Sequence, residues 1–115
     1  MAYMLLVVEQ PGLRATRSMD EGRDVYRRML DYSESLQADG VLIASNSLGS
    51  DAVRLDMRAG KPRVIDGPFS EAKEIIGGFF LVNCATRAEA VAIAGACPAT
   101  EWATIEVRPV GPCYE

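Results

Sequence analysis

The hydrophobic positions of this chain fall into short runs separated by turn-forming residues, a pattern that indicates strands. The opening run over residues 2–8 ends before Pro11 and Gly12. Residues 52–58 alternate between apolar and charged side chains, as a strand with one solvated face does. The turn at 59–62 makes this segment one half of a hairpin. The predicted strands are 2–8, 41–47, 52–58, 63–65, 79–84 and 103–110.

A longer segment predicts an amphipathic helix over residues 19–39. Ser18 and Glu21 have the spacing of a capping box, in which each side chain bonds to the backbone of the other residue. The apolar positions that follow form a one-sided stripe: Val25, Met29, Tyr32 and Leu36. Gly40 stands where a left-handed residue commonly ends a helix.

A second helix is predicted closer to the C-terminus. Thr86 and Glu89 repeat the capping-box spacing. The helix is expected to run from there to about Cys97, because Pro98 cannot continue it.

The predicted elements follow one another as strand, helix, strand, hairpin, loop, strand, helix and strand, in one domain that covers residues 1–115. The loop, or single helical turn, is the polar segment 70–76, and the glycine pair at 77–78 leads from it into the next strand. This order indicates an α+β fold with a largely antiparallel sheet. It approximates the ferredoxin-like split βαβ plan with an extra hairpin.

The strands at 2–8, 41–47 and 79–84 are apolar on both faces, because apolar side chains stand at odd and even positions alike. A sheet covered on one face only normally alternates between apolar and polar positions. Two helices can cover one face, so a second layer is expected on the other. A second copy of the chain is the favoured cover, in a two-fold homodimer. The alternative is that the segment 45–76 folds over that face.

Composition narrows the classes of function. The 115 residues are 49% apolar and 24% charged, which is ordinary for a globular domain. The net charge of −4 argues against nucleic-acid binding, and no apolar run approaches the length of a membrane span. The chain has no histidine, so His-based triads and His-ligated zinc are excluded. Its three widely spaced cysteines predict neither disulfides nor a metal site, and we expect a cytoplasmic protein without a cofactor.

The least generic stretch begins at Asp66. Gly67 and Pro68 predict a sharp turn directly after a strand, which would hold the Asp66 carboxylate in a fixed position. Partial burial beside Phe69 would raise the pKa of such a carboxyl group and suit it to acid or base catalysis. The alternative is structural: Asp66 bonds to its own backbone in an Asx-turn, and Phe69 fills the core.

The motif Asp66-Gly67-Pro68-Phe69 resembles the DGPF branch of the YCII-related family. It is followed here by Glu71, Lys73, Glu74 and Gly77-Gly78-Phe79. The resemblance extends over nearly the whole chain, through Tyr3-Met4-Leu5-Leu6, Gly60-Lys61-Pro62 and Ile105-Glu106-Val107-Arg108-Pro109.

This resemblance implies a dimeric α+β barrel built from ferredoxin-like protomers. The wider family is associated with a His–Asp pair in a cleft. Asp66 matches the aspartate, whereas the histidine has no counterpart in this chain. Proton transfer would then depend on Asp66, with Tyr3 or Glu106 as its partner, and Arg108 would hold an anionic group. Glu106 and Arg108 share one face of a strand, and an exposed or intersubunit ion pair is an equal alternative.

Three functions follow from this interpretation. The first is an enzyme or small-molecule-binding protein with a cleft at the Asp66 loop, where Tyr3, Phe69, Glu106 and Arg108 contact an unidentified ligand. The second is a non-catalytic regulatory or interaction module linked to sigma factors, a role that the family resemblance implies. The third, a cofactor-free monooxygenase, rests on analogy with other dimeric α+β barrels and ranks last.

Overall fold

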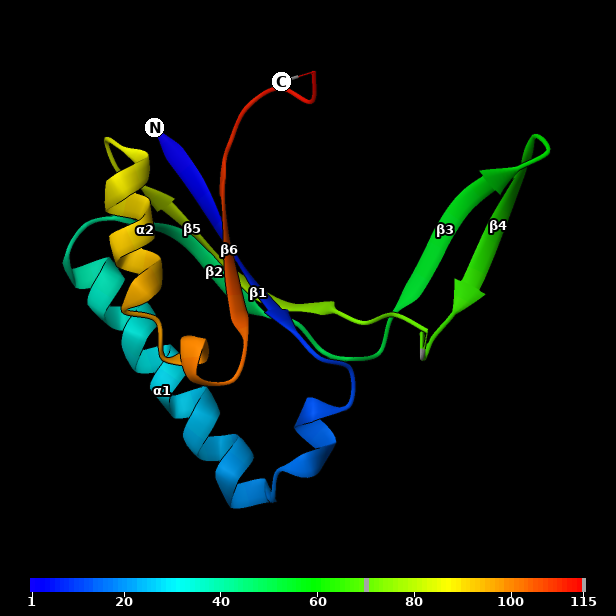
Figure 1. Ribbon diagram of the computed structural model, residues 1–115, viewed down its shortest axis with the longest axis horizontal. Coiled ribbons are helices and arrows are strands. Elements are labelled where there is room, and N and C mark those ends of the chain that lie inside the picture. The colour runs from blue at the N-terminus through cyan, green and yellow to red at the C-terminus, as the bar shows by residue number, and fades with distance from the viewer. Residues whose placement is uncertain (70, 115) are drawn as a thin grey trace.

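The computed structural model describes residues 1–69 and 71–114 and contains two separate antiparallel sheets. The larger sheet has the strand order β2-β5-β1-β6, and β3 and β4 form a hairpin of their own (Figure 1). The elements are β1 (Ala2–Glu9), η1 (Leu13–Thr16), α1 (Met19–Ala38), β2 (Leu42–Ser47), β3 (Val53–Arg58), β4 (Lys61–Asp66), β5 (Ile75–Asn83), α2 (Arg87–Gly95), η2 (Pro98–Glu101) and β6 (Thr104–Pro109). The mixed α+β class with an antiparallel sheet is therefore confirmed. No helix among the described residues is long and apolar enough to cross a membrane.

Helix α1 has the ends and the buried face that its sequence predicts. The Ser18 hydroxyl accepts a hydrogen bond from the backbone of Glu21, whose carboxylate accepts one from the backbone N–H of Ser18. Tyr32 and Leu36, in the predicted apolar stripe, are buried against the sheet. The chain leaves the helix through Gly40, which has a φ of 74°.

Helix α2 differs in part from its prediction. The Thr86 hydroxyl accepts from the Glu89 backbone, as expected. The Glu89 carboxylate, however, accepts from the backbone of Ala85 instead of Thr86, so the reciprocal half of the capping box is wrong. The helix ends at Gly95, before the expected end near Cys97, and Pro98 begins the short helix η2.

Strand β5 begins earlier than predicted and includes the glycine pair. It starts at Ile75, so the loop predicted over 70–76 is wrong at its C-terminal end, while Ser70 lies outside the described residues. In the pairing with β1, Val7 faces Gly78 and Val8 faces Ile76, which leaves Gly77 as the extra residue of a β-bulge. The two glycines are therefore part of the sheet and do not precede it.

The core lies between the larger sheet and the two helices. Alternate residues of β1 are buried, with Leu5 fully inaccessible to solvent at the centre of the sheet. Tyr32 meets Phe80 of β5 edge-on, with 5.0 Å between ring centroids, and its hydroxyl donates to the carbonyl of Ile93 at 2.6 Å. These contacts hold both helices on one face of the sheet, the helix face.

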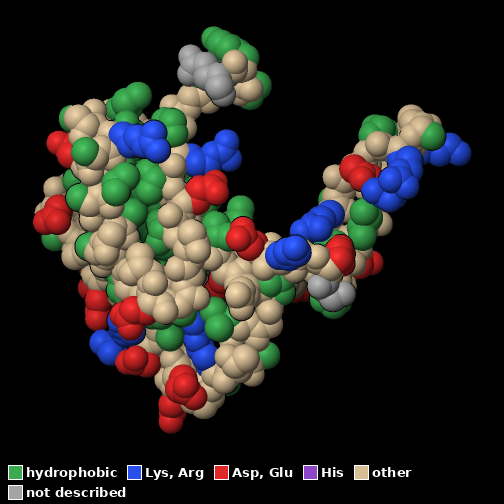
Figure 2. Space-filling model, viewed as in Figure 1, with side chains coloured by type: hydrophobic (Ala, Val, Ile, Leu, Met, Phe, Trp, Pro, Cys, Tyr) green, Lys and Arg blue, Asp and Glu red, His purple; other side chains and the backbone are tan. Residues whose placement is uncertain are grey.

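The opposite face of the sheet, here called the open face, carries no helix within the described residues (Figure 1). Its half-buried apolar side chains come from β1 and β5: Met4, Leu6, Val8, Phe79 and Leu81. Ile76, opposite Val8, is 50% exposed. The segment that was the alternative cover does not lie on this face. Its β3–β4 hairpin, here called the arm, extends away from the rest of the chain, and all six residues of β3 are exposed (Figures 1 and 2).

The environments of the cysteines predict a selective thiol reaction. Burial raises the pKa of the Cys97 thiol, whereas Cys113 is exposed in the C-terminal tail. Because the thiolate is the nucleophile, Cys97 is expected to resist an alkylating reagent at neutral pH while Cys113 reacts readily. Mass spectrometry of the labelled peptides measures this, with Cys113→Ser as the control. Rapid labelling of Cys97 without denaturant would contradict its burial.

Candidate functional site

The Asp66 turn closes the base of the arm. Asp66 is the exposed last residue of β4. The backbone N–H of Gly67 donates to the carbonyl of Ala52 at 2.9 Å, and a Cβ on Gly67 would lie 2.9 Å from that same oxygen. Phe69 is half-buried, with the Arg54 guanidinium 3.9 Å above its ring. The motif therefore lies where the arm joins the rest of the chain, and the backbones of Gly67 and Ala52 are in close contact there.

The other predicted site residues lie on different faces of the larger sheet. Glu106 and Arg108 are exposed on the open face, where they pair in register with Leu6 and Met4 of β1. Tyr3 is buried on the helix face, and its hydroxyl contacts the sulfur of Met1 at 3.6 Å. Within one chain the structure brings Glu106 and Arg108 onto one surface, and it places Tyr3 apart from both.

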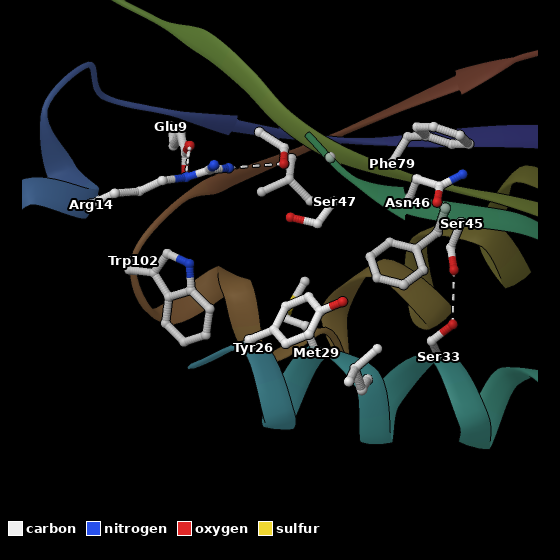
Figure 3. A pocket seen from close by; sticks show the side chains of 15 residues that line it. Glu9, Arg14, Tyr26, Met29, Ser33, Ser45, Asn46, Ser47, Phe79 and Trp102 are labelled. Atoms are coloured by element: carbon white, nitrogen blue, oxygen red, sulfur yellow. Dashed lines mark hydrogen bonds and ion pairs between the residues drawn. The ribbon is translucent and has the colours of Figure 1, made fainter. Parts of the chain in front are cut away.

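A cavity of about 160 Å³ lies between α1 and the helix face of the sheet, at the end where β1 finishes (Figure 3). We call it the α1 cavity. Its walls come from β1, η1, α1, β2, β5 and the residue after η2. Chemically, it has an ionic end, a hydroxyl end and aromatic sides. The side chains that give it this character are Glu9, Arg14, Tyr26, Ser33, Ser45 and Trp102.

The ionic end is a buried acid held by one arginine. Glu9 is only 5% exposed, and its Oε1 lies 2.9 Å from Nε of Arg14. The same arginine donates through Nη1 to the carbonyl of Leu48 at 2.6 Å and through Nη2 to that of Gly77 at 3.0 Å. Arg14 thus links the end of β1, the segment after β2 and the bulge of β5. Removing Arg14 would leave the Glu9 charge in a poorly solvated place, which is costly.

The ion pair does not satisfy the carboxylate fully. Oε1 of Glu9 is inaccessible to solvent and accepts no hydrogen bond from the described residues, although Arg14 lies close to it. Buried polar atoms in folded proteins nearly always have a partner with good geometry. A molecule bound in the cavity would donate to this oxygen after a small movement of the side chains that cover it.

Glycine at position 77 gives the ion pair its space. A Cβ built there would lie 2.6 Å from Oε1 of Glu9 and 2.9 Å from Nη2 of Arg14. Its neighbour Gly78 serves a different contact, because a Cβ there would lie 2.9 Å from the carbonyl of Asn46 in β2. The absence of a side chain at Gly77 therefore leaves room for Glu9 and Arg14. Its absence at Gly78 allows β2 to approach β5 closely.

The remaining walls combine hydroxyl groups and aromatic rings. The Ser33 hydroxyl of α1 and the Ser45 hydroxyl of β2 lie 2.8 Å apart and share a hydrogen bond (Figure 3). Trp102 is half-buried, and the guanidinium of Arg28 lies 5.3 Å from the centre of its ring. Tyr26, which is 54% exposed, stands at the solvent side of the cavity. These walls therefore add hydroxyl groups and aromatic rings to the ionic end of the cavity.

The α1 cavity has no metal-ligand set. Across residues 1–69 and 71–114, no three side chains of Cys, Asp or Glu gather closely enough to hold a metal ion. Glu9 is instead neutralised by Arg14. The chemistry available here is hydrogen bonding, charge pairing and stacking.

Comparison with known proteins assigns the chain to a family. The model of the YCII-related domain matches residues 1–113. The chain belongs to the YCII-related domain family. Among curated proteins, this YCII-related chain is similar to the uncharacterized protein R00369 of Rhizobium meliloti (strain 1021). The two are 32% identical over 116 residues, which cover 96% of this chain and 92% of the relative.

The YCII-related chain is also similar to a solved structure. That protein is the 5-chloro-2-hydroxyhydroquinone dehydrochlorinase TftG from Burkholderia phenoliruptrix AC1100, in complex with 2,5-dihydroxybenzoquinone. The TM-score is 0.56 at 18% sequence identity, over 96% of this chain and 94% of that chain. At this identity the likeness supports a common fold.

Sequence reasoning about the YCII-related chain missed Glu9 and Arg14. One signal for Glu9 was available, because it continues the alternate positions Tyr3, Leu5 and Val7 onto the buried face of β1. An acid in that register predicts a paired or functional carboxylate. No comparable signal marks Arg14, because its role depends on the folded position of η1, which brings Arg14 close to Glu9.

Proposed function

We propose that this YCII-related protein binds a small single-ring molecule in the α1 cavity, through a hydroxyl or amino group that donates to Glu9. The observation that carries the proposal is the buried Oε1 of Glu9, which accepts no hydrogen bond of good geometry from the described residues, although Nε of Arg14 lies 2.9 Å away. A cavity of about 150 Å³ accommodates one benzene ring, so the size fits a compact aromatic or quinone-like ligand. Trp102 and Tyr26 supply aromatic walls, and the Ser33–Ser45 pair supplies a second polar contact.

The similar structure is in keeping with this ligand class. TftG holds 2,5-dihydroxybenzoquinone, which is also a single ring with hydroxyl groups. In the present chain a ring hydroxyl donating to Glu9 would be positioned for proton transfer to that carboxylate. Without histidine, this is the acid–base chemistry that the cavity supports.

A ligand screen tests the proposal. Phenols, hydroquinones and aminophenols are added singly, and the change in Tm and the quenching of Trp102, the one tryptophan of the chain, are recorded. A true ligand is expected to stabilise the wild type, by about 2.7 kcal/mol at 100 times its Kd. Glu9→Gln should lose that stabilisation, because its amide replaces one carboxylate oxygen with an N–H group and removes the charge that Arg14 faces.

Matched variants make the screen decisive. Glu106→Gln carries the same substitution on the open face and should bind like the wild type. If Glu9→Gln proves too unstable to assay, Ser45→Ala is used to remove a hydroxyl from the opposite end, and it should weaken binding of a two-ended ligand. Equal binding by the wild type and Glu9→Gln, or no binding by any ring compound at millimolar concentration, would rule out this function.

The proposal includes a homodimer of ferredoxin-like protomers, arranged as a dimeric α+β barrel. The ferredoxin-like plan is supported by the position of β5 between β1 and β2, which α1 connects. The dimer is supported by the apolar open face, which two facing sheets would cover. Asp66, Phe69, Glu106 and Arg108 would then line a cleft between the copies, at the arm and the open face.

The remaining expectations have unequal support. A cytoplasmic location is kept in the proposal because the three cysteines are free, as is usual in a reducing compartment. No specific observation among the described residues or the relatives favours a link to sigma factors. That role is therefore not proposed.

A further inference from the structure

The arm has one apolar face, which nothing within the described chain covers. In the pairing of β3 with β4, Leu55 faces Val64 and Met57 faces Pro62. The large side chains of this face are mostly in solvent: Val53 at 54%, Leu55 at 68%, Met57 at 65% and Val64 at 62% exposure. Neighbouring apolar side chains that are this exposed are unusual on a monomer and indicate an interaction surface.

The other face of the arm is charged. It presents Arg54, Asp56, Arg58, Lys61 and Arg63, with one apolar residue, Ile65, opposite Arg54. Asp56 accepts a hydrogen bond from Nε of Arg63 at 2.8 Å, and the two side chains form an ion pair. The arm is therefore an amphipathic two-stranded ribbon. A ribbon of two strands is at best marginally stable in water, so its apolar face needs a surface to pack on.

The shape of the chain shows how far the arm departs from a compact subunit. The radius of gyration is 16.0 Å, whereas about 13 Å is expected for a compact domain of this length. Figure 2 shows the cause, because the arm stands apart from the larger sheet with a hollow between them. Subunits that interlock with a partner have this extended form.

Charge separates the arm from the rest of the chain. The arm, residues 53–66, carries four basic and two acidic side chains. Its net charge of +2 leaves −6 on the remaining residues, within a total of −4. Lys and Arg side chains are visible along the arm in Figure 2. A basic arm and an acidic body attract each other when they belong to two copies of the same chain.

We infer that two copies exchange arms, so that each arm packs its apolar face, Val53, Leu55, Met57 and Val64, on the body of the other copy beside its open face. The inference rests on the proposed homodimer and names the surface that holds it together. A second copy offers an apolar surface on which the arm can pack, and its acidic body attracts the basic arm. Two-fold symmetry forms this contact twice in each dimer.

Sedimentation velocity at low micromolar protein tests the exchange. The wild type is expected to be a dimer of twice 12.5 kDa. The double variant Leu55→Ser with Met57→Ser should raise the Kd of the dimer at least about tenfold, because two apolar side chains lose their burial. Arg58→Ser, on the charged face of the same strand, is the matched control and should remain dimeric. Far-UV circular dichroism and Trp102 fluorescence check that the body stays folded.

A photo-crosslinking amino acid in place of Leu55 locates the contact. Mixing isotopically heavy and light protein should give crosslinked peptides that join one arm to the body of the other copy. A wild-type dimer that the double variant leaves intact, or crosslinks confined to one chain, would refute arm exchange while leaving the homodimer in place. A wild-type monomer would refute both. Binding in the α1 cavity is measured separately and does not depend on these results.

Discussion

Replacing Leu5 by alanine is expected to lower the free energy of unfolding by about 3–5 kcal/mol. Leu5 is fully inaccessible to solvent in the central strand β1. Its neighbours in register are Phe80 of β5 and Val107 of β6, so the side chain lies at the middle of the core. The substitution removes apolar contacts and leaves a cavity that three strands and two helices cannot easily close.

Urea denaturation measures this effect. Val91→Ala, at a position of α2 that is 51% exposed, is the control and should change stability by less than about 0.5 kcal/mol. A loss of under about 1 kcal/mol for Leu5→Ala would mean that the core is not organised around β1.

The second large effect is expected at Gly77. Alanine at this position would place its Cβ 2.6 Å from Oε1 of Glu9, which is closer than real Cβ atoms approach. The carboxylate cannot swing into water, because Glu9 is 95% buried (5% exposed) and Arg14 holds it. Gly77→Ala is therefore expected to destabilise the fold by about 1–3 kcal/mol and to abolish ligand binding in the α1 cavity.

The matched control has the opposite expected sign. Gly22 lies inside α1, and a Cβ there would meet nothing within 4 Å. Gly22→Ala should raise stability by about 0.5–1 kcal/mol, because alanine has less backbone freedom to lose in a helix. Both variants are compared by denaturation and by Trp102 fluorescence. Equal behaviour of the two would show that the space at Gly77 is unimportant.

Local signals explain which elements could be predicted. The capping box at Ser18 and the stripe that ends at Leu36 involve residues close in sequence, and α1 was predicted nearly to its observed ends. The bulge at Gly77 depends on pairing with β1, some seventy residues earlier, so a glycine pair was mistaken for a lead-in to the strand. The alternation in β3 gave the strand correctly, but its apolar face is exposed in the chain and not half-buried.

The candidate site was harder to predict because no motif encodes it. Asp66 was chosen from its turn, and the structure places that turn at the base of the arm. The α1 cavity instead joins Glu9, Arg14 and Trp102 from opposite ends of the sequence. These side chains line one cavity only when β1, η1 and η2 have packed together in the folded chain. No local sequence pattern therefore predicts the site.

The pairing of the first strand with the last has a consequence for biosynthesis. Tyr3 lies opposite Pro109, and β5 and β6 flank β1 on its two sides. A nascent chain on the ribosome has made β1 long before either neighbour exists, so its apolar residues remain without strand partners until β5 and β6 have been synthesised. Chains released prematurely, before β6 is synthesised, would expose an edge of β1 and be substrates for chaperones or proteases.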